Sequence, residues 1–277
     1  MKSKCFFSHE DISKKIIRIT GISGEMMYLI KGSKRNVLID CGVGIGHLRE
    51  YINNSIGIDA DSVILTHGHI DHIGGAAEFE HVYINPLDNE LARSYMTKEK
   101  QLAHLYMCGI DSKNFEVEDY CEFKGIHFED IIPGQLIDLG DVKLHVLDAH
   151  GHTKGQVAIL IPDERVLIAG DSCNSFVFLF LQEATTVKEY KEMLEEMRRK
   201  TNGSYDRVLV CHGSGEEDKD IISKVIDVCD DIMGGRSDDI PFSLFGQSGY
   251  IAKAVGENNV RLDGGSGNIV YNGVATV

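Results

Sequence analysis

The sequence predicts a mixed α/β (α+β) fold in which two β-sheets pack face to face with helices on the outside. Two observations support this prediction. Short apolar runs of strand composition are followed by mixed strand and helix segments, and this order occurs twice along the 277 residues. The hydrophobic content of 43% is enough for a full globular core. Two facing sheets covered by helices would bury these apolar runs.

The first half of the chain is expected to form mainly strands. The expected strands are residues 15–19, 25–31, 36–40, 61–66 and 81–84. The second and third of these would form a hairpin around the turn Gly32-Ser33-Lys34. A short helix is expected at 47–54. Residues 87–122 then change character, because they are polar, favour helices and are rich in Met and Tyr. We predict two helices there, near 87–96 and 98–107.

The second half returns to strands, expected at 135–139, 142–147, 156–161, 165–169 and 205–211. Thr186 and Glu189 form a capping box that begins a helix, and its apolar face is Val187, Tyr190, Met193, Leu194 and Met197. Ser214 and Glu217 are predicted to form a second capping box, for a helix with the apolar stripe Ile221, Ile222, Val225, Ile226 and Cys229. Gly234-Gly235 would end that helix. From about residue 240 the tail is rich in glycine, and Asn272-Gly273 favours a type I′ hairpin. We describe residues 1–277 as a single domain, with a helical insertion at about 87–122 and a glycine-rich C-terminal tail.

Composition limits the classes of partner and location. The formal charge is −15, from 28 basic and 43 acidic residues, and an acidic surface repels phosphate backbones, so no nucleic-acid partner is expected. No segment resembles a signal peptide or reaches the roughly 18 apolar residues of a membrane helix. We therefore expect a soluble cytoplasmic protein with no membrane partner. The seven cysteines are odd in number and lack C-x-x-C spacing, which argues against a disulfide scaffold and a zinc ribbon.

The strongest functional signal is the segment 66–72, Thr-His-Gly-His-Ile-Asp-His. It follows the apolar strand at 61–66, so its side chains emerge at the carboxyl end of a strand. Neutral imidazole suits zinc, iron and similar ions, and a carboxylate adds a charged oxygen ligand. We expect His67 and His69 to approach one ion while Asp71 and His72 face another.

Ligand-type residues recur where three later strands end. His150-Gly151-His152-Thr153, Gly170-Asp171 and His212-Gly213 each follow a predicted strand. Strand ends that converge on one edge of a sheet form active sites in other α/β architectures. The order H-x-H-x-D-H, G-H-T, G-D and H-G resembles the metallo-β-lactamase superfamily, over about residues 15–235.

This resemblance implies a four-layer αββα sandwich and a binuclear metallo-hydrolase. Residue by residue, it implies that His67, His69 and His152 hold the first metal. Asp71, His72 and His212 would hold the second, and Asp171 would bridge the two. Asp40 would be a second-shell aspartate. The two divalent ions would most naturally be zinc, with iron and manganese as alternatives.

The expected nucleophile is a metal-bridging hydroxide that the catalytic Asp71 orients, because two ions that share a water lower its pKa towards neutrality. The expected substrate is a small-molecule ester, thioester or lactone. A small-molecule phosphodiesterase is the alternative, followed by an iron-dependent sulfur or oxygen oxidoreductase and a non-catalytic sensor. Asp171 replaces the cysteine of one subclass of zinc β-lactamases, which argues against β-lactamase activity. A homodimer is left open.

Further residues have two interpretations each. His150 replaces a proline that is frequent in this family, and it is either a second-shell donor or substrate contact, or a solvated loop residue. Cys41, Cys173 and Cys211 lie close to predicted site residues, as soft alternative ligands or as small apolar fillers. The apolar run 176–181 would favour a substrate with a greasy group, or would be ordinary core. The insertion would act as a lid with Tyr95, Tyr106 and Met107 facing the cleft, or as structural padding.

Overall fold

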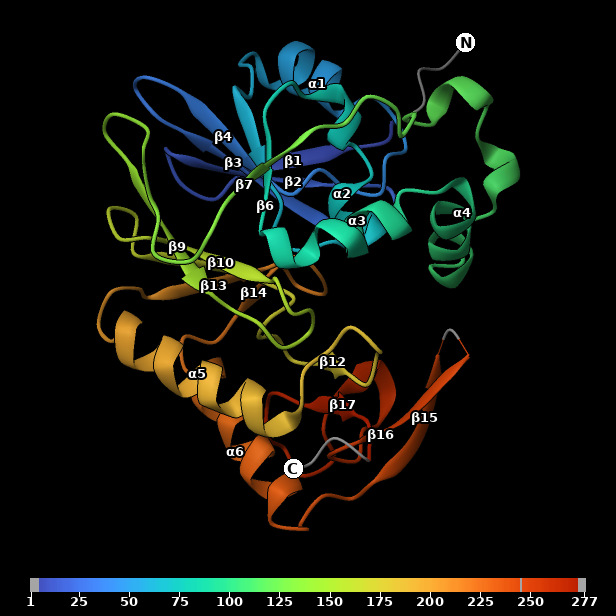
Figure 1. Ribbon diagram of the computed structural model, residues 1–277, viewed down its shortest axis with the longest axis vertical. Helices are drawn as coiled ribbons and strands as arrows, with labels where there is room; N and C mark the ends of the chain where they lie inside the picture. The colour runs from blue at the N-terminus through green and yellow to red at the C-terminus, as the bar shows by residue number, and fades with distance from the viewer. Residues whose placement is uncertain (1–4, 245, 274–277) are drawn as a thin grey trace. The chain divides into compact units, whose positions relative to one another are not determined.

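The computed structural model describes residues 5–244 and 246–273 (Figure 1). The chain divides into two compact units. The first comprises Met1–His145 with Cys211–Gly213, and the second comprises Val146–Val210 with Ser214–Val277. The description of the chain as one domain with an insertion and a tail stays a prediction. Within the described residues, no helix is long and apolar enough to cross a membrane.

The first unit is built on a seven-stranded sheet in the order β1-β2-β3-β4-β5-β6-β7. Its strands are β1 Ser8–Asp11, β2 Ile16–Thr20, β3 Met26–Lys31, β4 Asn36–Ile39, β5 Ser62–Ile64, β6 Val82–Ile84 and β7 Phe128–Asp130. β1 to β4 form antiparallel pairs, whereas β4 to β7 run parallel. All five strands predicted in this half are present. β4 and β5 therefore end at the same edge of the sheet, where Asp40 and the histidine-rich segment follow.

The helices of this unit are mostly short. They are α1 Leu48–Tyr51, the π-helix Ile52–Ile56, α2 Ile70–Ile73, α3 Asn89–Tyr95 and α4 Lys98–Met107, with 3₁₀ turns at Ala76–Glu78, Pro86–Asp88, Ser112–Asn114 and Val117–Asp119. The predicted helices near 87–96 and 98–107 are confirmed as α3 and α4. Thr97 caps α4 by accepting a hydrogen bond from the backbone N–H of Lys100, which separates the two helices.

A close backbone approach positions the helix that carries Asp71 and His72. A Cβ atom on Gly74, at the end of α2, would lie 2.2 Å from the carbonyl carbon of Val43. The backbone N–H of Gly74 donates to the carbonyl of Gly42 at 2.7 Å, and that of Cys41 donates to the carbonyl of His72 at 2.8 Å. Because no side chain fits at Gly74, the loop after β4 packs directly against α2.

The second sheet has six strands in the order β14-β13-β11-β10-β9-β8. They are β8 Leu136–Asp138, β9 Lys143–Asp148, β10 Val157–Ile161, β11 Val166–Gly170, β13 Arg207–Val210 and β14 Glu216–Glu217. Five of the six match the predicted segments to within about two residues. β11 and β13 are parallel and Gly170 lies opposite Val210, so these two strands end together.

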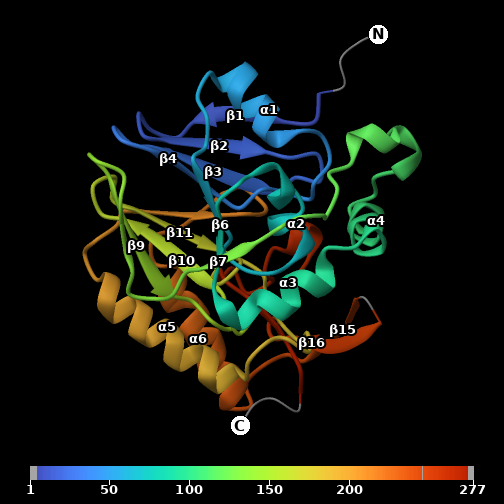
Figure 2. The ribbon, with the colours of Figure 1, turned by 45° about the horizontal axis from the view of Figure 1, so that its top comes forward.

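Two long helices, α5 Val187–Thr201 and α6 Ile221–Met233, lie side by side in the second unit (Figures 1 and 2). The predicted capping box of α5 is confirmed, with reciprocal hydrogen bonds between Thr186 and Glu189. The apolar faces of both helices match the prediction. They are buried in one hydrophobic cluster with Leu160, Leu167 and Val208 of the sheet.

The second predicted capping box is wrong. Glu216–Glu217 form strand β14, paired antiparallel with β13, and α6 begins only at Ile221 after Asp220. The glutamates have other partners, since Glu216 forms an ion pair with Arg207 at 2.6 Å and Glu217 accepts from the backbone of Ser175 at 2.8 Å. Pairing with a neighbouring strand, which local sequence does not reveal, prevails over the capping pattern.

The glycine-rich tail contains strands that were not predicted, besides the first strand of the hairpin expected at Asn272-Gly273. β15 Ile240–Leu244, β16 Gln247–Ile251 and β17 Ile269–Tyr271 form a four-stranded sheet with β12 Val177–Leu179, in the order β12-β17-β16-β15. The return strand of the predicted Asn272-Gly273 hairpin lies outside the described residues. β12, which follows Asp171, pairs in parallel with β17, so the end of the chain supports a segment next to a predicted site residue.

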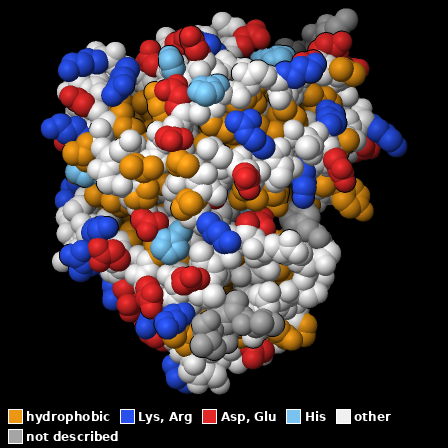
Figure 3. Space-filling view, in the orientation of Figure 1, with side chains coloured by type: hydrophobic (Ala, Val, Ile, Leu, Met, Phe, Trp, Pro, Cys, Tyr) orange, Lys and Arg blue, Asp and Glu red, His pale blue; other side chains and the backbone are white. Residues whose placement is uncertain are grey.

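Charged side chains are distributed over the surface. On the face drawn in Figure 3, acidic and basic side chains are interspersed. Neither sign of charge forms a separate patch on that face.

Candidate metal centre

The histidine-rich segment forms a tight, buried loop after β5. His67 and Gly68 lie in the loop, His69 precedes the first residue of α2, and Asp71 and His72 lie in that short helix. The side chains of the three histidines and of Asp71 are buried. Gly68 is required, because a Cβ atom there would lie 2.8 Å from the backbone nitrogen of Ala92. Its N–H donates to Asp88 at 3.0 Å, which ties the loop to the start of α3.

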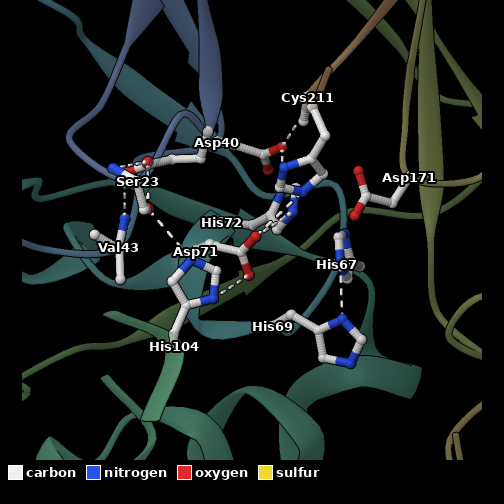
Figure 4. Close-up of polar contacts among 12 residues, drawn as sticks. Ser23, Asp40, Val43, His67, His69, Asp71, His72, His104, Asp171 and Cys211 are labelled. Carbon is white, nitrogen blue, oxygen red and sulfur yellow. Dashed lines mark hydrogen bonds and ion pairs between the residues drawn. The ribbon is translucent and has the colours of Figure 1, made fainter. Parts of the chain in front are cut away.

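The loop brings three imidazoles together (Figure 4). The Nε2 atom of His67 lies 3.1 Å from the Nδ1 atom of His69. The rings of His67 and His72 are 4.0 Å apart between centroids. Nitrogen atoms of several buried imidazoles thus converge, as they do in sites that bind a transition metal.

A second group gathers on Asp71. Its Oδ2 atom lies 3.2 Å from Nε2 of His212 and 3.5 Å from Nε2 of His72. The ligand atoms of these three residues are close enough to one another to share one ion. His212 follows β13 in the sequence, so the structure joins positions 71 and 212 as the sequence predicted.

Asp40 orients His72 from behind. Its carboxylate accepts hydrogen bonds from the backbone N–H of Thr66 at 2.7 Å, from the Thr66 hydroxyl at 2.8 Å and from Nδ1 of His72 at 2.8 Å. Because Nδ1 of His72 carries the proton, its Nε2 is the atom that offers a lone pair towards Asp71 and His212. Asp40 has a φ of 60°, a left-handed conformation that an aspartate tolerates better than most residues.

In the second unit, His152 and Asp171 lie close together. Nδ1 of His152 donates to the carbonyl of Phe178 at 2.8 Å, and its Nε2 lies 3.9 Å from Oδ2 of Asp171. Asp171 follows β11 directly. The backbone carbonyl of β12 therefore orients His152 in the way that Asp40 orients His72.

The structure thus assembles the predicted residues in two sets. His67, His69, Asp71, His72 and His212 belong to the first unit, and His152 and Asp171 belong to the second. Imidazoles and carboxylates are the donor groups that zinc and similar divalent ions bind, and the tautomers of His72 and His152 are fixed by their hydrogen bonds. The residues therefore fit a metal, while the assignment of each one as a ligand stays a prediction.

His150 contacts a carboxylate of its own loop. Its Nδ1 atom lies 2.9 Å and 3.0 Å from the two oxygens of Asp148. The hydrogen bond that His150 donates to Asp148 raises the pKa of His150 above its usual value, against the opposing effect of burial. The proposed second-shell role of His150 stays a prediction.

The sequence interpretation missed His104, which lies on α4. Its Nδ1 atom is 3.9 Å from Oδ1 of Asp71, and its Nε2 donates to the hydroxyl of Ser23 at 3.2 Å (Figure 4). Ser23 in turn donates to Glu25 at 2.5 Å. No motif surrounds position 104 in the sequence, so only the packing of α4 reveals this contact.

The charge of Asp71 is stabilised by its neighbours. Burial alone would raise the pKa of this carboxyl group, but the nearby imidazoles of His104 and His72 and the hydrogen bond from His212 outweigh it. The pKa of Asp71 is held well below its usual value. Asp71 is therefore ionised at neutral pH and available to a cation.

The predicted lid residues differ in their surroundings. Tyr95 packs its ring 4.9 Å from that of His69. Tyr106 is 86% exposed and Met107 is 41% exposed. Gln101, His104 and Leu105 form the buried side of α4, and the role of the segment as a lid stays a prediction.

The three cysteines near the site are buried. The Cys211 thiol lies 3.4 Å from Asp40, and the Cys41 thiol donates to the carbonyl of His72 at 3.2 Å. Burial raises the pKa of the Cys41 thiol well above its usual value, and burial has the same effect on Cys173. The thiols of Cys41 and Cys173 are therefore protonated at neutral pH, as expected of small apolar fillers.

Comparisons with known proteins identify the family. Residues 21–202 match the family model of the metallo-beta-lactamase superfamily. Acyl-coenzyme A thioesterase MBLAC2 of Homo sapiens is 28% identical over 164 residues, which cover 52% of this chain and 57% of that protein. A metallo-beta-lactamase fold-containing protein, ST1585 of Sulfurisphaera tokodaii, is 26% identical over 201 residues, covering 68% of this chain and 72% of that protein.

The fold is also similar to solved structures. A metallo-beta-lactamase from Pontibacter korlensis superposes with a TM-score of 0.60 at 18% identity, covering 81% of this chain and 99% of that one. The chain belongs to the metallo-beta-lactamase superfamily, and the predicted α+β fold of that type is confirmed. The predicted membership of this superfamily is confirmed, and the metallo-hydrolase activity that it implies is a proposal. The chain spans little more than half the length of the curated thioesterase.

Asp40 offers a first test of the site. We expect Asp40→Asn to lower affinity for the metal bound at His72 by about 10- to 100-fold, the usual effect of losing a partner behind a histidine ligand. The amide retains the shape of the side chain but lacks the charge that holds the proton on Nδ1 of His72. Competition with a chromogenic chelator measures the change. Asp206→Asn, which alters an exposed carboxylate paired with Arg165, is the control, and equal affinity in both variants would contradict the assignment.

Proposed function

We propose that this chain hydrolyses a small thioester or ester whose acyl group is apolar. The metal ions would be held by His67, His69, Asp71, His72, His152, Asp171 and His212. Family membership supports the metallo-hydrolase chemistry. The relative named as an acyl-coenzyme A thioesterase supports the substrate class, and so does an aromatic surface next to two of the proposed ligands.

The aromatic surface is the observation that carries the substrate class. It consists of Phe178 on β12, Phe176 just before that strand and Phe242 on β15. The ring of Phe180 is buried and packs against them. The rings of Phe178 and Phe242 lie 5.8 Å apart between centroids, and those of Phe180 and Phe242 lie 5.3 Å apart. Phe176, Phe178 and Phe242 are only partly buried, so they offer apolar area to a ligand.

This surface is tied to the site through the backbone. The carbonyl of Phe178 accepts the hydrogen bond from Nδ1 of His152. A hydrocarbon chain that lies along Phe178 would therefore begin next to His152 and Asp171. Burying each methylene group of such a chain contributes about 0.8 kcal/mol, which favours an acyl substrate over a polar phosphodiester.

The residues of the first unit would carry out the chemistry. When bound, divalent ions supply a water molecule of lowered pKa and polarise the substrate carbonyl. Asp71 is ionised, and its carboxylate orients that water and accepts its proton. His104 and His212 stabilise the ionised form of Asp71. Attack of the water oxygen on the thioester carbonyl would form a C–O bond and break the C–S bond. One proton of the water goes to the thiol product and the other to solvent, and the acyl group leaves as a carboxylate.

A substrate panel tests the proposal. Metal-reconstituted protein is assayed with a thioester, a carboxylic ester, a lactone and a phosphodiester, each beside the Asp171→Ala variant. We expect hydrolysis of the thioester or the ester, with loss in the variant. Phosphodiester hydrolysis alone would overturn the substrate class in favour of a phosphodiesterase. Bound metal with no hydrolysis of any of them would overturn the proposal as a whole.

The acyl surface can be tested separately with Phe242→Ala. We expect kcat/KM for an octanoyl thioester to fall about 5- to 30-fold, corresponding to the roughly 1–2 kcal/mol of apolar contact that one ring supplies. Acetyl thioester hydrolysis should change little, because an acetyl group is too short to reach the ring. Tyr250→Ala, on neighbouring β16, is the control. Equal losses for both chain lengths in Phe242→Ala would argue against an acyl-binding role.

A further inference from the structure

We propose that His47, Glu78 and Cys121 form a second, structural zinc site, separate from the residues discussed above. Their ligand atoms lie within 4.8 Å of one another. None of the three belongs to the motifs that the sequence highlights. The inference rests on none of the residues in the proposed function.

The distances suit a tetrahedral ion. Nδ1 of His47 lies 3.4 Å from Oε1 of Glu78, and two ligands on zinc are separated by about 3.4 Å for nitrogen and oxygen and about 3.6 Å for sulfur and oxygen, given the usual bond lengths. The Cys121 thiol donates to the same Oε1 atom at 2.8 Å. On binding, a zinc ion would replace that thiol proton, which is released to water, and the sulfur would move away from the oxygen to bond the metal.

Each ligand is held from behind by the backbone. The Nε2–H of His47 donates to the carbonyl of Glu118 at 3.0 Å, which leaves its Nδ1 as the lone-pair atom facing Glu78. The other carboxylate oxygen of Glu78 accepts from the backbone N–H of Arg49 at 2.7 Å. The backbone N–H of Cys121 donates to Gly44 at 2.9 Å. Partners of this kind orient the ligands of protein metal sites.

The site is partly open. The Cys121 residue is 7% exposed and the Glu78 side chain is 14% exposed, whereas the His47 side chain is 53% exposed. Three protein ligands would leave the fourth position of a tetrahedral ion to water. A thiolate, an imidazole and a carboxylate together match the borderline-soft character of zinc better than that of magnesium or calcium.

The location indicates a structural role. His47 precedes α1, Glu78 ends the 3₁₀ turn after α2, and Cys121 follows the last turn of the segment 87–122. Ile45 and Tyr120 form an isolated β-bridge, and Gly46 donates to the carbonyl of Asp119 at 2.7 Å. A zinc ion would fasten the end of that segment to the loop before α1, next to the segment's return to the sheet.

The test uses a spectroscopic signal that the proposed catalytic ligands cannot give, since none of them is a thiol. Metal-free full-length protein is titrated with Co²⁺, and thiolate-to-cobalt charge-transfer absorption is recorded in the near ultraviolet. We expect the band in the wild-type chain and its loss, together with one equivalent of bound Co²⁺, in Cys121→Ser. The band should persist in Cys108→Ser, an exposed control, and in Cys211→Ser, which removes the thiol near Asp40.

A second variant keeps the test decisive if Cys121→Ser folds poorly. His47→Ala removes an exposed imidazole. We expect it to lower the affinity for the Co²⁺ ion that gives the band by at least tenfold, while esterase or thioesterase activity is retained. Zn²⁺ should displace the band in the wild-type chain. Absence of the band in the wild type, its persistence in Cys121→Ser, its loss in Cys211→Ser or unchanged affinity in His47→Ala would each overturn the proposal.

Discussion

We expect Asp71→Asn to lower kcat/KM for the preferred substrate by about 10²- to 10⁴-fold, which is the usual contribution of a positioned general base. The carboxylate oxygens of Asp71 lie 3.2 Å from Nε2 of His212, 3.5 Å from Nε2 of His72 and 3.9 Å from Nδ1 of His104. The amide retains nearly the same volume but loses the negative charge that these imidazoles surround. It also has a much weaker capacity to accept a proton or to bind a cation.

Steady-state kinetics and metal analysis on the same samples separate the two roles of Asp71. A fall in kcat with full metal content identifies the proton acceptor, whereas a fall in both identifies chiefly a metal ligand. Asp11→Asn, on the exposed strand β1, is the matched control and should behave as wild type. Wild-type activity in Asp71→Asn would show that the chemistry does not pass through this carboxylate.

We expect Tyr190→Ala to lower the free energy of unfolding by about 3–5 kcal/mol, the typical effect of removing a large buried aromatic side chain. Tyr190 lies on α5 and is completely buried in the hydrophobic cluster of the second unit. Its hydroxyl donates to the carbonyl of Ser172 at 2.5 Å. The truncation leaves a cavity under the sheet and removes a hydrogen bond to the residue that follows Asp171.

Urea unfolding of the metal-free protein measures this effect without the contribution of bound ions. Tyr190→Phe removes only the hydroxyl, and we expect a loss of about 1–3 kcal/mol. Tyr106→Ala on α4 is the control, because an 86% exposed ring contributes little to the core. Similar stabilities for Tyr190→Ala and Tyr106→Ala would mean that α5 does not depend on this contact.

Local patterns in the sequence were sufficient to predict most strands, the two long helices and the positions of the metal-binding motifs. A strand or a helix with one apolar face has a period that is visible within about ten residues. The capping box at Thr186 and Glu189 was confirmed because capping is a contact between residues three apart. The motifs at 67–72, 152, 171 and 212 were recognisable because each lies shortly after a strand.

Tertiary structure decided what depends on partners distant in the sequence. Glu216 and Glu217 form a strand because β13 and Arg207 are available to pair with them, and the tail forms a sheet because β12 accepts β17 as a neighbour. His104 reaches Asp71 from α4, and Gln101 of the same helix donates to the carbonyls of Val43 and Gly44 at 2.9 Å. Likewise, His47, Glu78 and Cys121 carry no spacing signal, since three loops bring them together. The sequence by itself thus determined which candidate metal ligands follow the strands. Packing decided which side chains those candidates contact, because contacts between distant residues leave no local period in the sequence.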